Sequence, residues 1–487
     1  MTKIFNYRGR LILGLIILAE LFSIFTFYVP AFNNAAVVII ATLFLVLTFY
    51  RLDYGVLLLL TELFIGSKGY LFYFESGGLQ ISLRIIFWLI VLSVWFGQFL
   101  AQWLKEKKFP WSEKFPYLKA SLALLFFILF GFVQGWLRGH DFNNLFFDFN
   151  GWLYFFLLLP LYQAFIVSDK RREAWEILRQ IFILTLVWLS VKTLILFYFF
   201  THNAPSILPD IYRWLRLSGL AEVTPAPGGF WRVFFQSHVF LLLAAPFLIL
   251  PLDGAKKEGR VWIFRLLLVL CFAGVIISMS RSFWLALAVL LLFLAIFIWQ
   301  GRGIKAAFRA TWQWVLALVI SLLLILAIAK FPWPTPSGSF NLSVFADRAN
   351  IAQDESAISS RWALLDSLKE ELKQNPILGQ GFGALVTYKS SDPRIAETTA
   401  DKMQTTYAFE WGWLDVWLKI GLGGLLAYLY LLFIITKSSW RSNPAIGLSL
   451  LALMVANIFT PYANHPLGIT WIMLMMLLAW DYKLDKK

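Results

Sequence analysis

The sequence predicts an all-α polytopic membrane protein with about 14 transmembrane helices, and two observations support this fold class. First, 60% of the 487 residues are hydrophobic and only 14% are charged, with a mean hydropathy of +0.72, whereas soluble domains carry about 25% charged residues. Second, apolar runs of the length that a membrane helix needs, about 17–25 residues, recur from one end of the chain to the other.

Composition also limits the function classes. The formal net charge is +14, but the basic residues collect in short loops between apolar runs, where they set membrane orientation. We therefore expect no nucleic-acid partner. The lone cysteine, Cys271, lies in an apolar run and excludes a disulfide framework or a thiolate metal cluster. No Asp, Glu and His residues stand at metal-ligand spacing, so neither a metal nor a cofactor is expected.

The apolar runs define the predicted spans. The first is longer than the apolar core of a signal peptide and is expected to be retained as a helix. The third is short and contains Glu62, so a count of 12 to 14 is compatible with the pattern. The predicted spans are residues 11–29, 34–50, 53–66, 82–104, 117–136, 150–168, 178–200, 237–252, 261–279, 283–299, 312–331, 412–436, 446–461 and 466–481.

Loop charge predicts the orientation of these spans. With 14 spans and the amino terminus inside, basic loops such as "KEKKFPWSEK", "DGAKKEGR" and "GRGIKAAFR" all fall on the cytoplasmic side, whereas omission of any single span would put basic loops on both sides. Both termini are therefore predicted to be cytoplasmic. Two long loops then lie on the outer side. The chain is accordingly divided into an N-terminal transmembrane bundle (1–200), a first extracytoplasmic loop (201–236), central transmembrane helices (237–331), a large extracytoplasmic loop (332–411) and C-terminal transmembrane helices (412–487).

The large loop is expected to contain an amphipathic helix that lies against the membrane or the bundle. Ser359 or Ser360 is the expected N-cap, and Asn375–Pro376 ends the helix because proline disfavours helical backbone in the residue before it. Its expected apolar stripe is Trp362, Leu365, Leu368 and Leu372.

A glycine-rich stretch, "PILGQGFG", follows that helix. It has no preceding strand and no Lys-Ser/Thr pair of a phosphate-binding P-loop. A tight reversal of the chain is therefore the expected role.

Four segments together resemble the O-antigen ligase and O-antigen polymerase superfamily. They are the arginine-led helix followed by "NPILGQGFG", then "GWLDVWLKIGLGGLLAYL", and the earlier "ISMSRSFWLALAVLLLFLAIF" and "GGFWRVFFQSHVF". The resemblance covers roughly residues 230–435. It implies a multi-pass enzyme of the bacterial inner membrane that transfers or polymerises polyprenyl-diphosphate-linked glycans on the extracytoplasmic face. The implied partners are that lipid-linked donor, a glycan or lipid acceptor and membrane lipid, in the synthesis of lipopolysaccharide or exopolysaccharide.

If the resemblance holds, the leaving diphosphate needs positive charge at the outer surface. Guanidinium groups suit this role because they stay charged and hold two phosphate oxygens at once. Arg232, Arg281 and Arg361 are predicted on that side next to spans, and they are the expected diphosphate-binding residues of a metal-independent glycosyltransferase. The alternative is ordinary: Arg232 and Arg281 reach toward headgroups, and Arg361 is a solvated helix residue.

The acceptor hydroxyl needs a general base. The ligase pattern of the family has a histidine, usually followed by Asn, shortly before the span that starts here near Gly412. This sequence has Glu410 and Trp411 at those positions. Partial burial of Glu410 beside Phe409 and Trp411 would suit a base, because burial disfavours a carboxylate. The alternatives are that Glu410 anchors the chain at the interface and that the family base is lost.

Three further residues are candidate accessory groups: Asp415, one turn into the same span, His238, and His465 in a polar turn between the last two spans. For His465, a structural role in that turn is the favoured reading. The departure from the ligase histidine favours a polymerase over a ligase.

Charged residues inside predicted spans keep other functions open. They either form ion pairs within the bundle or line a pathway for protons or substrate, as in a membrane transporter or permease. A third possibility is a catalytically inactive relative with a structural role. The charged residues in question are Glu20, Glu62, Arg84 and Lys192.

Overall fold

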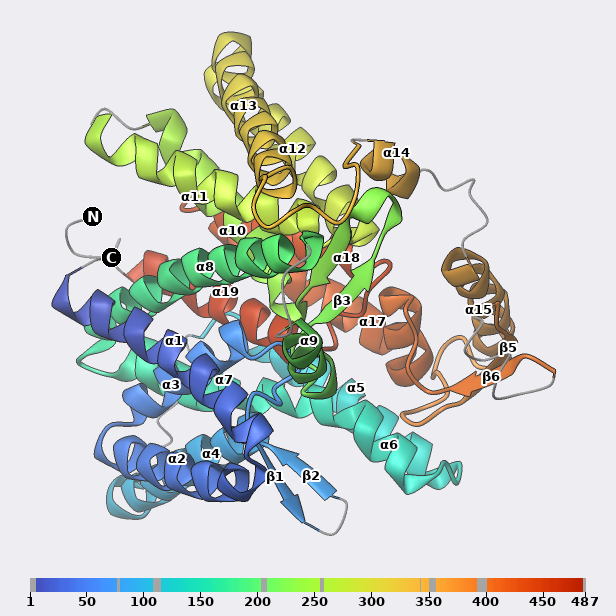
Figure 1. Cartoon of the computed structure of the whole chain (residues 1–487). Helices are drawn as coiled ribbons and strands as arrows, with labels where there is room; N and C mark the ends of the chain where they lie inside the picture. The colour runs from blue at the N-terminus through green and yellow to red at the C-terminus, as the bar shows by residue number, and fades with distance from the viewer. Residues whose placement is uncertain are drawn as a thin grey trace. The chain divides into compact units, whose positions relative to one another are not determined.

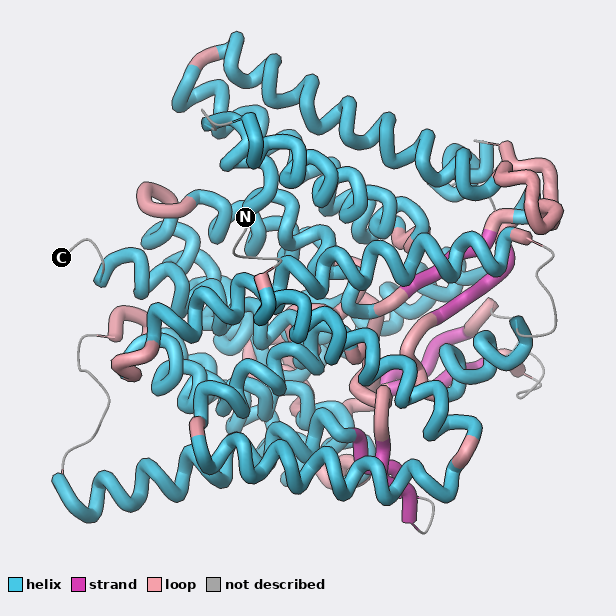
Figure 2. The backbone as a smooth tube through the Cα atoms, turned by 60° about the vertical axis from the view of Figure 1, so that its left-hand side comes forward, coloured by secondary structure: helices cyan, strands magenta, loops and turns pink. Residues whose placement is uncertain are grey.

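The structure is a computed structural model, and helices make up most of it (Figures 1 and 2). All of the predicted spans overlap helical segments. The residues that the structure describes are 6–76, 79–107, 115–202, 208–254, 258–341, 343–349, 356–391 and 401–484.

A multi-pass helical membrane protein is confirmed. Within the described ranges, 10 helices are long and apolar enough to cross a membrane, and three apolar helices are shorter. The count of about 14 and the orientation of the spans stay predictions. The chain also contains three two-stranded antiparallel sheets, which the hydropathy pattern does not predict. Their strands are four residues each and fall in connecting segments.

By their contacts, the residues form two compact units. Unit 1 contains Met1–Pro110 and Leu157–Phe345, and unit 2 contains Trp111–Phe156 and Ala346–Lys487. The division of the chain by predicted spans into 1–200, 201–236, 237–331, 332–411 and 412–487 stays a prediction of membrane topology.

Unit 1 is built around α8 (Arg171–Thr201), which packs against α1, α3 and α11. Its other helices are α1 (Tyr7–Tyr28), α2 (Pro30–Tyr50), α3 (Leu52–Ile65), α4 (Leu83–Glu106), α7 (Leu158–Tyr162), α9 (Leu208–Leu217), α10 (Val239–Gly254), α11 (Glu258–Ile277), α12 (Arg281–Arg302) and α13 (Ile304–Ala329). Its hairpins pair β1 (Tyr73–Ser76) with β2 (Leu79–Ser82) and β3 (Glu222–Pro225) with β4 (Trp231–Phe234). The short helix α14 (Ser343–Ala349) contains the boundary with unit 2.

The four charges predicted inside spans form two ion pairs in unit 1. Lys192 of α8 lies 2.5 Å from the carboxylate of Glu20 on α1. Arg84 of α4 lies 2.7 Å from the carboxylate of Glu62 on α3. All four residues are buried. The pairing satisfies charges that would otherwise be very costly inside apolar helices, as ion pairing within the bundle predicts.

Unit 2 carries the C-terminal helices, and α5 (Leu118–Leu137) packs along α17 (Gly412–Ser439). Its remaining elements are α6 (Phe142–Phe149), α15 (Ser356–Gln374), β5 (Val386–Lys389), β6 (Met403–Thr406), α18 (Pro444–Ala456) and α19 (Pro466–Leu484). In Figure 1, α15 lies beside the β5–β6 hairpin.

The predicted amphipathic helix is α15, and it ends at Gln374, directly before Asn375–Pro376. Two details of the prediction are wrong. The helix begins at Ser356, so Ser359 and Ser360 lie inside it rather than at its cap. Trp362 is 52% exposed, and Leu364 takes its place in the buried stripe. Leu364, Leu368 and Leu372 pack with Ala384, Val386, Phe409 and Leu418 in an apolar core of unit 2.

Candidate functional site

The first half of α17 ends at a break in the helix at Gly421. This residue has φ 71° and ψ 176°, which is not helical. The break leaves backbone groups that a continuous helix would pair internally. The glycine loop (Pro376–Gly383) supplies their partners: Gln380 N–H donates to the Leu418 carbonyl at 2.5 Å, and Leu422 N–H donates to the Ile377 carbonyl at 3.0 Å. Non-helical backbone in an apolar segment persists where protein satisfies it in this way.

The glycines of this loop allow a sharp reversal of the chain. Gly379, Gly381 and Gly383 have φ values of 75°, 86° and 79°. Glycine adopts such left-handed conformations without the steric cost of a side chain. The geometry agrees with the predicted chain reversal.

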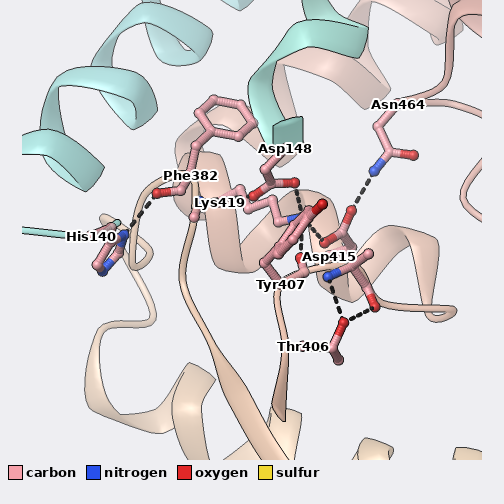
Figure 3. Close-up of polar contacts among 10 residues, drawn as sticks. His140, Asp148, Phe382, Thr406, Tyr407, Asp415, Lys419 and Asn464 are labelled. Atoms are coloured by element: carbon pink, nitrogen blue, oxygen red, sulfur yellow. Dashed lines mark hydrogen bonds and ion pairs between the residues drawn. The ribbon is translucent and has the colours of Figure 1, made fainter. Parts of the chain in front are cut away.

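The glycine loop also packs directly against α5. Phe382 N–H donates to the Gly131 carbonyl at 3.1 Å. A Cβ atom on Gly381 would collide with the backbone of Gly135. Nδ1 of His140 lies 2.7 Å from the Phe382 carbonyl oxygen (Figure 3). The small residues of both segments therefore let a loop and a helix approach backbone to backbone.

A buried ion cluster lies beside this break (Figure 3). The ammonium group of Lys419 contacts Asp148 of α6, lies 2.5 Å from the carboxylate of Asp415, and donates to the Tyr407 carbonyl at 2.9 Å. The amide of Asn464 donates to the other carboxylate oxygen of Asp415. We call these five residues the Lys419 cluster.

The cluster is almost inaccessible to solvent. The side chains of Lys419, Asp148 and Asp415 are 1%, 7% and 2% exposed. Asp148 also accepts a hydrogen bond of 2.9 Å from the Gly383 N–H, so the cluster is joined to the glycine loop. Ionisable groups buried in apolar helices are costly and often mark functional sites.

At the start of α17, Arg361 and Glu410 form an ion pair. Their side chains are 38% and 51% exposed, so the Glu410 carboxylate is reachable from outside while its side chain is half-buried. Its neighbour Phe409 is buried. The indole N–H of Trp411 donates to the Arg361 carbonyl at 2.9 Å and joins α15 to α17 beside the pair. The candidate base and one candidate diphosphate ligand thus meet at one accessible point of unit 2.

The other two predicted arginines both belong to unit 1. Arg232, on β4, donates through Nε to the Ser278 carbonyl at 2.9 Å and lies 3.2 Å from the Glu222 carboxylate. Arg281 is the first residue of α12, three positions after Ser278. The β3–β4 hairpin therefore holds the Arg232 guanidinium against the turn that leads into Arg281.

The candidate histidines have structural partners. His238 is fully buried, and its Nε2 lies 2.8 Å from the hydroxyl of Thr193. His465 accepts a hydrogen bond of 3.3 Å from the Leu467 N–H at the start of α19. This contact agrees with the structural reading of His465, whereas the catalytic roles proposed for both histidines stay predictions.

Sequence reasoning singled out Asp415 but missed Lys419, Asp148, Asn464 and Tyr407. Lys419 follows Asp415 by four positions inside a predicted span, which is the spacing of an ion pair on one helix face. The sequence alone therefore contains a local signal for Lys419. Nothing local in the sequence indicates Asp148, which is 271 positions from Lys419.

The comparisons with known proteins concern the segment that contains most of this site. Residues 266–429 match the model of the O-antigen ligase family. This segment includes Arg281, Arg361, Glu410 and the first half of α17. A comparison with curated proteins found no match. The family match supports the resemblance seen in the motifs: residues 266–429 of the chain are similar to the O-antigen ligase family.

Proposed function

We propose that the protein is a membrane glycosyltransferase that moves a glycan from a polyprenyl-diphosphate donor to an acceptor hydroxyl on the extracytoplasmic face. The match of residues 266–429 to the O-antigen ligase family carries this proposal. The Arg361–Glu410 pair supports it, because a cation for the leaving group and a carboxylate for proton removal lie side by side at the start of α17.

The proposed reaction is a substitution at the anomeric carbon of the donor sugar. The acceptor oxygen forms a bond to that carbon while the bond from carbon to the diphosphate oxygen breaks. Glu410 accepts the proton of the acceptor hydroxyl as general base. The electron pair of the broken bond stays on the lipid diphosphate, and arginine side chains offset the charge that develops there. This chemistry requires no metal in the proposed mechanism.

Arg361 is the proposed diphosphate ligand in unit 2, and Arg232 and Arg281 are the proposed ligands in unit 1. The exposed pairing of Arg361 with Glu410 leaves the guanidinium able to exchange partners, because an exposed ion pair contributes only about 0.2–1 kcal/mol. A diphosphate with two or more negative oxygens is a stronger partner than one carboxylate.

We further propose polymerisation rather than ligation as the activity. Its basis is Glu410 at the position of the ligase histidine. Deletion of the gene separates the two activities in cells. A polymerase deletion leaves single repeat units attached to the acceptor and removes long chains. A ligase deletion leaves long chains on the lipid carrier, and this outcome would contradict the assignment.

A permease remains a weaker candidate. Its basis was the set of charges inside predicted spans, and in unit 1 these charges pair with one another. An inactive relative is distinguished from an enzyme by direct assay.

The assay uses purified full-length protein with a synthetic oligosaccharide on a polyprenyl diphosphate. We expect glycan transfer, and we expect Arg281→Ala and Arg361→Ala to raise the donor KM by about 10–100-fold, the equivalent of a lost hydrogen bond to a charged group. Lys369→Ala, on the same helix as Arg361, and Arg302→Ala, at the far end of α12, are matched controls with expected wild-type KM. Wild-type KM in both arginine variants would contradict the proposed diphosphate site.

A further inference from the structure

The ammonium group of Lys419 contacts two carboxylates and one backbone carbonyl. A lysine side chain has three N–H donors. Asp148 and the backbone carbonyl of Tyr407 accept hydrogen bonds from it, and the Asp415 carboxylate is an ion-pair partner at 2.5 Å. The two carboxylates offset its charge. The uncharged carbonyl does something else: it fastens the segment ahead of α17 to α17 itself.

That segment is a fixed turn that leads to Glu410. The Thr406 hydroxyl accepts from the Ala408 N–H at 3.1 Å and contacts the Ala408 carbonyl oxygen at 3.2 Å (Figure 3). Phe409 is 2% exposed, and its ring centroid lies 5.0 Å from the Lys419 nitrogen. These contacts fix the backbone before and after Tyr407, and Glu410 follows directly after this fixed segment.

The energetics of buried charges argue for a role in positioning. Burying an ion cluster costs desolvation that its attractions barely offset, and apolar replacements are often as stable. What such a cluster provides is a defined arrangement of the segments it joins. The Lys419 cluster joins α6, the glycine loop, the turn before α17 and the segment before α19, and all of them belong to unit 2.

We infer that Lys419 is a positioning residue for the transfer reaction, which holds Glu410 in place for proton removal through the Tyr407 carbonyl. This inference rests on the proposed function. Lys419 touches neither donor nor acceptor; it keeps the Glu410 carboxylate at a fixed place beside Arg361. A general base acts only within hydrogen-bond reach of its proton, so a loosened turn removes its contribution.

A double-mutant cycle tests the inference, because residues that act as a unit have non-additive effects. Asp148→Asn serves as the background. The variant Asp148→Asn/Lys419→Met loses one negative and one positive charge, so its cluster has the same formal net charge as the wild type. Glu410→Gln is added to Asp148→Asn and to Asp148→Asn/Lys419→Met. We expect Glu410→Gln to lower kcat by about 10²–10⁴-fold in the first. In the second we expect a loss of less than about tenfold, because Glu410 is already misplaced.

The donor KM is a second readout. Arg361 is untouched, so Lys419→Met should not raise the donor KM, and a weakened pairing of Arg361 with Glu410 should lower it by at most about fivefold. Lys437→Met, in the last turn of the same helix, is the matched control and should leave the effect of Glu410→Gln at full size. Should Asp148→Asn/Lys419→Met not fold, Lys419→Arg keeps the charge. Its planar guanidinium does not place three donors as an ammonium does, so the effect of Glu410→Gln should shrink there too.

The possible outcomes test the positioning role of Lys419 and the proposed function separately. Equal kcat losses on Glu410→Gln with and without Lys419 overturn the positioning role alone and leave the proposed function intact. A wild-type protein that transfers no glycan overturns the proposed function and this inference with it. If Glu410→Gln has no effect in the Asp148→Asn background, both the base assignment and the positioning role are wrong.

Discussion

Arg361 and Glu410 lie 49 positions apart in the sequence and form an ion pair beside the start of α17. In the proposed reaction, these two side chains have separate partners, the diphosphate and the acceptor proton. Before substrate binds, the two side chains pair with each other, so Glu410 competes with the diphosphate for Arg361. A substitution that removes this competition should therefore change the donor KM as well as kcat.

Glu410→Gln should lower kcat and tighten donor binding together. The neutral amide removes the base, so kcat falls by about 10²–10⁴-fold. It also removes the competitor for Arg361, and the donor KM should fall by up to about fivefold, the equivalent of an exposed ion pair of about 0.2–1 kcal/mol. Steady-state kinetics with the lipid-diphosphate donor measure both values.

The matched control for this variant is Glu370→Gln on α15, an exposed glutamate that pairs with Lys373 at 2.7 Å. It should leave both constants unchanged. A wild-type kcat in Glu410→Gln would remove Glu410 as the base, and a raised donor KM would contradict the competition.

A comparison of two glycines in unit 2 distinguishes the cost of backbone strain from the cost of steric overlap. Gly139 and Gly381 have φ values of 75° and 86°, but a Cβ atom on Gly139 meets open space, whereas one on Gly381 collides with α5. Alanine costs about 1–3 kcal/mol of backbone strain at either position. Gly381→Ala should cost a further 1–3 kcal/mol, roughly, for the steric overlap. Thermal unfolding in detergent should show the larger fall in Tm for Gly381→Ala, and equal falls would contradict the close approach.

The Lys419 cluster should be replaceable without loss of stability. We expect the triple variant Asp148→Leu/Asp415→Leu/Lys419→Met to unfold with a free energy equal to the wild type or higher by about 1–4 kcal/mol. Lys419→Met alone leaves two buried carboxylates unpaired and should cost about 3–5 kcal/mol. Both variants should lose about 10²–10⁴-fold in kcat, as Glu410→Gln does, because the base is no longer held in place. A triple variant less stable than Lys419→Met would show that the cluster is chiefly a stabilising device.

Removal of divalent metal should not change the transfer rate. In the proposed mechanism, guanidinium groups offset the charge of the leaving diphosphate, as metal ions do in other phosphate-binding enzymes. Dialysis against EDTA and an assay in its presence test this expectation. A metal-dependent glycosyltransferase treated in the same way is the control. Loss of activity that Mg²⁺ or Mn²⁺ restores would contradict the arginine-based mechanism.

The helical part of the fold follows from local sequence. A helix in an apolar environment must satisfy its own backbone, so the length of each apolar run is enough to locate it. The end of α15 before Asn375–Pro376 follows from proline geometry in the same way. By contrast, helical spacing predicts Trp362 on the buried face, although Leu364 lies there. The packing partners of a helix decide which of two neighbouring stripes is buried.

The candidate site was only partly predictable. The family motifs pointed to Arg361 and Glu410, but their direct pairing depends on how α15 packs beside α17. The break at Gly421 gives no local signal, because "GLGG" in an apolar run also suits a tightly packed continuous helix. Asp148 and Asn464 reach Lys419 and Asp415 only through tertiary structure. Hydropathy and residue spacing do not predict such contacts between segments that are distant in the sequence.

The break in α17 has a consequence for how the chain is assembled during translation. Synthesis runs from the amino terminus, so Gly131, Asp148 and the glycine loop are made before Gly421 leaves the ribosome. The backbone partners of the discontinuous helix are thus already present when α17 inserts. Asn464 is made only after α18, so Asp415 obtains its last partner near the end of translation. Insertion of α17 as an independent apolar segment is therefore unnecessary, since its polar half has a prepared protein surface to dock on.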